Sequence, residues 1–414
     1  MNARGPLTLA LCLLACSRER KGSPVEALVG DATPRLEKTV GVPFKTPPKF
    51  EMRSREEVRQ FLEQRFATDL PDADLRGSER TYKRFGLIPD SLSLRDFMLK
   101  LLTEQIVGYY DPKAKVLYIV QGAKDDMVSI TVSHELVHAL QDQYFNLDSL
   151  QGIKRQNDRQ VAAQAVMEGQ ATLEQVASMI GGGTAVANLP GGWDRVREMI
   201  RDGQSAMPTF ASAPLVIQET LLFPYLSGAE FMKNWKEKNG GKLPFEDMPV
   251  STEQVMHEDR FFLNRDDPTI VTLPPVAGAG DVYENNLGEF ETRLLLFQHL
   301  KDRDAAYRGA AGWDGDKFMS WTGARGDGLA WLSVWDTSVD AAEFLDLMDT
   351  ALLKRFEDLR PLASTTSRHQ YSTRGRTIAI SAVEVAGRPC VLYVDVPAGA
   401  SVDVIDLRKV KLEE

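Results

Sequence analysis

The feature that most constrains this chain is the run of residues 133–140, which contains His-Glu-x-x-His. On a helix, His134 and His138 lie one turn apart on the same face. Two imidazoles at this spacing can reach one zinc ion at about 2.0–2.1 Å each. Glu135 lies beside the first histidine, so its carboxylate can act as a general base without ligating the metal. The alternative is a chance match on an ordinary amphipathic helix.

A catalytic zinc ion usually takes three protein ligands and leaves a fourth position for water. A further histidine along the same helix is excluded, because Gln141 and Tyr144 occupy the positions where that variant carries glycine and histidine. Glu168 is the alternative third ligand, since an acidic residue among Ala, Val and Met is costly to bury unpaired. Gly169 beside it would let this second helix approach the first closely. A solvated glutamate on a helix surface is the competing interpretation.

These residues resemble the gluzincin peptidases, including the peptidase MA-like members, through His134, Glu135, His138 and, in a Glu-Gly-x-Ala context, Glu168. The resemblance implies that the two histidines and Glu168 ligate zinc and that Glu135 is the base. Many gluzincins carry an aspartate one turn after the ligand glutamate, where it orients a ligand histidine. This chain has Thr172 at that position, so other groups must orient its ligands.

Two β-rich runs, Ile106–Asp111 and Val116–Val120, flank a short turn that contains proline, a pattern that predicts a hairpin. The resemblance implies that one of these strands borders the cleft and binds an extended substrate by β-addition. An interior strand without a ligand is equally compatible with the sequence.

The N-terminus has the pattern of an export signal, with Arg4 before an apolar run at Leu7–Ala15 that is too short to span a bilayer. Its end, Leu13–Cys16, resembles a bacterial lipobox, which implies cleavage before Cys16 and lipidation of its thiol. An ordinary secretory signal is the alternative. Ser17 favours the outer membrane, facing the periplasm, if the cell is Gram-negative. We therefore expect a lipid-anchored protein of the cell envelope.

The 414 residues are enough for two or three domains. We expect an α+β fold: a mainly helical, zincin-like catalytic domain with a small β-sheet before the zinc helix, and then a smaller α+β module at the C-terminus. The predicted divisions are the signal peptide at 1–15, a proline-punctuated tether at 16–50, the catalytic domain at 51–260 and the C-terminal module at 261–414. Within that module, residues 312–316 read as a turn.

Peptide hydrolysis also needs a donor for the oxyanion of the tetrahedral intermediate. The sequence offers His257 as this candidate stabiliser, ahead of His299 on an amphipathic helix and His369 in a polar loop. A structural role for His257 stays open. Tyr225 could face the cleft, although a core or capping role fits its surroundings better.

The net charge of −10 argues against nucleic acid and against a polybasic membrane patch. We expect a zinc-dependent endopeptidase that cleaves a peptide or protein substrate and contacts the membrane only through its lipid. Three ligands without a suitable cysteine, together with Glu135, favour catalysis over a structural zinc site. The alternatives are a non-catalytic, zinc-containing lipoprotein that binds extended peptides or serves envelope assembly, and hydrolysis of another envelope amide. The sequence leaves the oligomeric state undecided.

Overall fold

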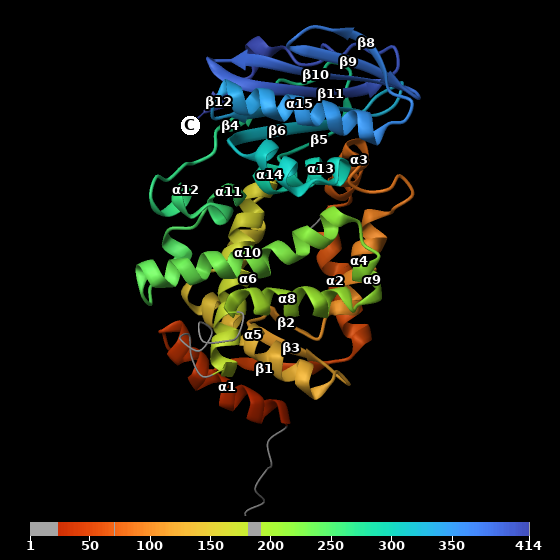
Figure 1. Ribbon diagram of the computed structural model, residues 1–414. Coiled ribbons are helices and arrows are strands. Elements are labelled where there is room, and N and C mark those ends of the chain that lie inside the picture. Colours follow the sequence, from red (N-terminus) through yellow and green to blue (C-terminus); the bar gives the residue numbers. More distant parts are fainter. Residues whose placement is uncertain (1–23, 70, 181–191, 414) are drawn as a thin grey trace, which may run out of the picture.

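The computed structural model describes residues 24–69, 71–180 and 192–413 of the chain (Figure 1). The predicted signal peptide and Cys16 lie outside the described residues, so cleavage and lipidation stay predictions. Within the described ranges, no helix is both long enough and apolar enough to cross a membrane.

The fold is α+β, as predicted from the sequence. The helices are α1 (Pro24–Val40), α2 (Arg55–Asp69), α3 (Asp72–Phe85), α4 (Leu94–Gln105), α5 (Asp125–Tyr144), α6 (Asn157–Ile180), α8 (Gly192–Ser205), α9 (Pro208–Ala211), α10 (Leu215–Asn239), α11 (Thr252–Met256), α12 (Glu258–Phe262), α13 (Gly288–Leu300), α14 (Arg303–Ala310) and α15 (Ser338–Arg355). The strands are β1 (Lys49–Arg53), β2 (Gly108–Asp111), β3 (Val116–Val120), β4 (Ile270–Thr272), β5 (Gly280–Asn285), β6 (Trp313–Thr322), β7 (Gly328–Trp335), β8 (Arg360–Ser364), β9 (Arg368–Thr373), β10 (Arg376–Val385), β11 (Arg388–Pro397) and β12 (Lys411–Glu413).

A small sheet precedes the helix of the His-Glu-x-x-His motif, as expected. Its strand order is β1-β3-β2, with β1 parallel and β2 antiparallel to β3. The predicted hairpin is confirmed as β2 and β3. All five residues of β3 are buried in the centre of the sheet, so β3 cannot be an edge for substrate. Of the two hairpin strands, only β2 lies at an edge of the sheet, so only β2 can be the predicted substrate-binding strand.

The tether predicted for residues 16–50 is wrong for its described part. Residues 24–40 form helix α1, which packs against α5 and α6. Its buried residues recur at helical spacing: Val25, Val29, Ala32, Leu36 and Val40. The prolines suggested a linker, but Pro24 occupies the first helical position, where it is tolerated. Apolar periodicity outweighs the single missing donor of Pro34 inside the helix.

Helices α6 and α10 cross with their backbones in contact. A Cβ atom added to Gly169 would lie 2.1 Å from the carbonyl carbon of Gly228, and one added to Gly228 would lie 2.1 Å from the carbonyl oxygen of Ala165. We expected Gly169 to allow a close approach of α5, which carries the His-Glu-x-x-His motif. It instead allows the close approach of α10. Helix α10 is continuous through Pro224.

The C-terminal part contains a seven-stranded sheet in the order β5-β6-β7-β11-β10-β9-β8. Helix α15 packs against β7, β10 and β11 on one face, with α13 and α14 beside it (Figure 1). The expected turn at residues 312–316 lies mostly within β6, which contains a register shift there.

One hydrophobic core joins the helical part to the large sheet. Phe85, at the end of α3, makes ring contacts with Phe318, Trp331 and Tyr393 of the sheet. Residues from both sides of the predicted domain boundary at residue 260 therefore share this core. The boundary itself remains a prediction.

Candidate metal centre

Helix α5 has one side that is buried against α1 and the small sheet and another side that faces α6. Val132, Leu136 and Val137 are completely buried against α1 and the small sheet. Asp125 and Asp126 occupy the first turn of the helix, where negative charge is favourable. Packing of the apolar side fixes the rotation of the helix and turns His134 and His138 toward α6.

Three side chains converge at this place. The Nε2 atoms of His134 and His138 are 3.2 Å apart, and they lie 3.0 and 3.3 Å from Oε2 of Glu168. Tetrahedral zinc with ligands at about 2.0–2.1 Å would separate its ligand atoms by about 3.3 Å. Among the described residues, this is the one group of three or more His, Cys, Asp or Glu side chains close enough to share a metal ion. The structure therefore brings together all three predicted ligands.

The opposite nitrogen of each imidazole faces a glutamine amide. Nδ1 of His134 is 3.1 Å from Oε1 of Gln175, and Nδ1 of His138 is 2.9 Å from Oε1 of Gln141. The Gln141 amide is itself fixed, because its Nε2 donates to the carbonyl oxygen of Met167 at 3.0 Å. An Nδ1–H that donates to an amide oxygen leaves Nε2 free to ligate a metal.

Thr172 does not take over the role of the missing aspartate. Its hydroxyl is buried and has no hydrogen-bond partner within the described structure. The two glutamines were not predicted from the sequence, although each lies at helical spacing from a predicted ligand. Gln141 follows His138 by three residues, and Gln175 follows Glu168 by seven.

The electrostatics of the centre suit a cation. Burial lowers the pKa of His138, but the Glu168 carboxylate outweighs burial and raises that pKa to about 9. Burial raises the pKa of Glu168, yet the charge of His138 and the hydrogen bonds from both histidines hold it well below its ordinary value. The carboxylate thus requires a positive partner, which a proton or a metal ion can supply.

Glu135 lies beside these ligands and is held by the small sheet. Its Oε2 accepts the backbone N–H of Tyr110 in β2 at 2.8 Å. The Tyr110 hydroxyl donates to Asp142 at 2.7 Å, which ties β2 to the far end of α5. Burial raises the pKa of Glu135, and the charges of the two histidines partly offset this. A carboxylate with a raised pKa is suited to accept a proton.

Tyr225 belongs to the same centre. Its ring stacks on His134 with 5.9 Å between centroids. The charge of Glu168 and then burial hold the pKa of the Tyr225 hydroxyl well above its ordinary value, so the group remains a donor. The contact of Gly228 with α6, one turn further along α10, brings this tyrosine close to Glu168. Tyr225 therefore lies beside the predicted ligands, the placement that we weighed from the sequence as the alternative to a core or capping role.

His257 lies elsewhere. It caps α11, and its Nε2 is 2.9 Å from the buried carboxylate of Glu289. Thr252 in the same short helix bonds to Asp158, which is ten residues, or about 15 Å of helix, from Glu168. The sequence could not reveal that His257 would contact a buried carboxylate on α13. The structure does not assemble the predicted stabiliser with the other predicted site residues.

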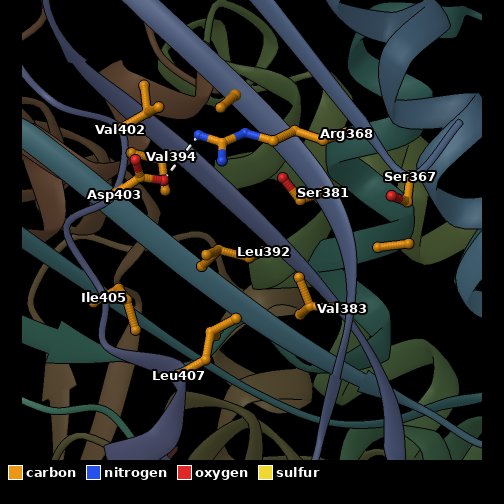
Figure 2. A pocket seen from close by; sticks show the side chains of 12 residues that line it. Ser367, Arg368, Ser381, Val383, Leu392, Val394, Val402, Asp403, Ile405 and Leu407 are labelled. Carbon is orange, nitrogen blue, oxygen red and sulfur yellow. Dashed lines mark hydrogen bonds and ion pairs between the residues drawn. The ribbon is translucent and has the colours of Figure 1, made fainter. Parts of the chain in front are cut away.

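A separate cavity of about 210 Å³ lies on the outer face of the large sheet, between β10, β11 and the chain at residues 402–407. Figure 2 shows its apolar floor, with Leu392 and Val383, and the ion pair of Arg368 and Asp403 at one end. None of its lining residues belongs to the metal centre.

Comparisons with known proteins leave the centre unassigned. A family model described as a domain of unknown function (DUF8575) matches residues 263–405, the region of the large sheet. A search of curated proteins gave no match. One similar solved structure is that of a "putative hydrolase with a novel fold" from Chloroflexus aurantiacus. It has 16% sequence identity and a TM-score of 0.32, and the match covers 58% of this chain and 89% of that one. A TM-score this low carries no inference about this chain.

Proposed function

We propose that this chain is a zinc-dependent peptidase that resembles the gluzincins. The observation that carries the proposal is the convergence of His134, His138 and Glu168, whose ligand atoms are 3.0–3.3 Å apart. A His₂Glu set leaves a fourth position open, as catalytic zinc sites do. When bound there, zinc would polarise the scissile carbonyl and lower the pKa of the attacking water.

The chain's own residues supply the remaining chemistry. Glu135 takes the proton of the attacking water and passes it to the leaving amine. Tyr225 donates a hydrogen bond to the oxyanion that develops on the carbonyl. Both groups lie beside the ligands, Glu135 next to His134 in α5 and Tyr225 stacked on the ring of His134.

Strand β2 supplies an edge for the substrate backbone. Val120 donates its N–H to the carbonyl of Val107. Because paired residues alternate in an antiparallel ladder, Gly108 and Tyr110 turn their backbone groups away from β3. The bond between Tyr110 N–H and Glu135 agrees with this direction. The Tyr110 N–H is already bound to Glu135, so an extended peptide can pair with the outward backbone groups of Gly108 and the Tyr110 carbonyl, within reach of Glu135.

The place of action is proposed from the N-terminal sequence alone. The lipobox-like residues 13–16 lead us to propose attachment through a lipid on Cys16 and a peptide or protein substrate in the cell envelope.

The test uses the purified full chain and a mixture of peptides. Cleavage should stop after treatment with a zinc chelator and return when zinc is added back. His134→Ala and Glu168→Ala should each lose both bound zinc and cleavage. Zinc binding by Glu168→Ala as tight as that of the wild type would contradict the ligand assignment. Cleavage that survives complete removal of metal would contradict the proposed function.

A further inference from the structure

Three apolar side chains are exposed on the two helices of the metal centre. Met127 and Ile130 in α5 have exposed fractions of 40% and 36%, and Met179 in α6 has 53%. We call these three residues the apolar shoulder. Exposed apolar residues are ordinary when scattered, but a group beside a binding site indicates a ligand surface.

Helical spacing places the shoulder next to the metal ligands. In α5, Ile130 and Met127 precede His134 by four and seven residues, so all three lie on one face. In α6, Met179 follows Gln175 by four residues, and Gln175 contacts His134 at 3.1 Å.

The two helices run antiparallel, because His134 contacts Gln175 whereas Gln141, further along α5, contacts Met167. Past the contact between His134 and Gln175, one more turn of each helix reaches Ile130 and Met179. Ile130 of α5 and Met179 of α6 therefore lie at the same end of the helix pair, one turn beyond His134 and Gln175.

The free edge of β2 leads to the same place. A Cβ atom added to Gly108 would lie 2.9 Å from Cγ2 of Thr131, so one face of β2 packs against α5 at the neighbour of Ile130. Two residues further along the strand, Tyr110 reaches Glu135. A peptide that pairs with the outer edge of β2 thus passes from the shoulder to the proposed base.

We propose that the apolar shoulder binds a large apolar side chain of the peptide substrate, such as Leu, Met or Phe, near the scissile bond. This proposal rests on the proposed function and adds its specificity. Burial of the substrate side chain would remove apolar surface of both partners from water. Methionine is flexible and polarisable, so a surface with two methionines can adapt to side chains of different shape.

The test measures binding without turnover, in zinc-loaded protein that carries Glu135→Gln. Pairs of fluorescent peptides differ only in Leu or Ser at one position, which is moved along the peptide, and affinity is read from anisotropy. The shoulder variant is Ile130→Thr with Met179→Gln. The control is Leu353→Thr on α15, where a leucine has a similar exposed fraction of 55%.

At one peptide position, the unmodified shoulder should favour Leu over Ser, and the shoulder variant should lose about tenfold of that preference, a typical effect of small changes in apolar contact. The control should keep the preference. Equal preference in all three proteins, or none in any, would overturn the proposal. So would a shoulder variant that loses association with phosphatidylethanolamine–phosphatidylglycerol vesicles but keeps its peptide preference, since the shoulder would then be a membrane contact.

The proposed peptidase function and the proposed role of the shoulder can fail independently of each other. If the wild type cleaves none of the peptides that the shoulder selects, the surface is a peptide-binding site without peptidase activity. If the wild type cleaves peptides in a zinc-dependent way without regard to apolar residues, the peptidase stands and the shoulder proposal falls.

Discussion

At the residue scale, the orienting groups of this centre are neutral amides. The oxygen atoms of Gln175 and Gln141 face the Nδ1 atoms of His134 and His138, the two histidines that we propose as ligands. An amide oxygen fixes the tautomer and the ring, as a carboxylate would, but adds no negative charge to the site. The proposed zinc site therefore relies on Glu168 for the negative charge among its ligands and their orienting partners.

Loss of Gln175 should weaken zinc binding without removing a ligand. Gln175→Ala should reduce zinc affinity about 10–100-fold, the usual effect of removing such a partner. Competition with a chromophoric chelator measures this. Gln164→Ala, the same substitution at an exposed position of α6, is the control and should bind zinc like the wild type. Equal affinity in both variants would show that Gln175 does not orient His134.

Substitutions at Tyr225 and His257 should have different effects on kcat, because we propose that Tyr225 and not His257 stabilises the oxyanion. Tyr225→Phe keeps the ring on His134 and removes only the donor, so kcat should fall about 10²–10³-fold with little change in KM. His257→Asn should leave kcat close to that of the wild type. Steady-state kinetics on one peptide decide the matter, and the reverse pattern would return the role to the histidine.

At the element scale, the centre depends on the crossing of α6 and α10. Gly169→Ala forces a methyl group against the backbone of Gly228 and should lower the free energy of unfolding by about 1–3 kcal/mol. Denaturant unfolding measures the change. The control is Gly203→Ala in α8, where an added Cβ atom has open space, and it should be neutral or stabilising. Equal stability of the wild type and the Gly169 variant would mean that the crossing relaxes freely.

Local sequence patterns predicted much of the secondary structure. They could not predict features that depend on contacts between distant segments of the chain. The two β-rich runs around the turn at residues 112–115 were enough to predict the β2–β3 hairpin. The local pattern could not reveal that β1 would pair with β3 from 67 residues away and make β3 the central strand. Likewise, the spacing of the motif and an apolar context pointed to His134, His138 and Glu168, whereas Tyr225 enters the site only through the packing of α10 on α6.

At the scale of the whole molecule, buried acids should make stability depend on pH. Burial is the main cause that raises the pKa of Asp158 to about 8, of Glu253 to about 9 and of Glu291 to about 7. These groups lie where α6, α11 and α13 join the helical part to the large sheet. In the unfolded chain they would ionise near pH 4.

Between pH 5 and pH 8, the folded state should therefore hold more protons at these groups than the unfolded state, and their contribution to stability should fall as pH rises. The contribution is at most about 1.4 kcal/mol per pH unit for each group. Asp158→Asn keeps an acceptor for the Thr252 N–H and removes one such group. Urea unfolding at several pH values should show that the variant gains stability relative to the wild type as pH rises. A constant difference between the two proteins would contradict the protonated state of Asp158.

A paired measurement on Glu135→Gln decides whether Glu135 transfers a proton without binding the metal. Gln keeps an oxygen that can accept the Tyr110 N–H, so zinc content and peptide affinity should match those of the wild type. Its amide is not a usable base, so kcat should fall by at least about 10²–10⁴-fold. A variant that retains zinc and cleaves peptides as fast as the wild type would contradict the proposed role of Glu135 as general base.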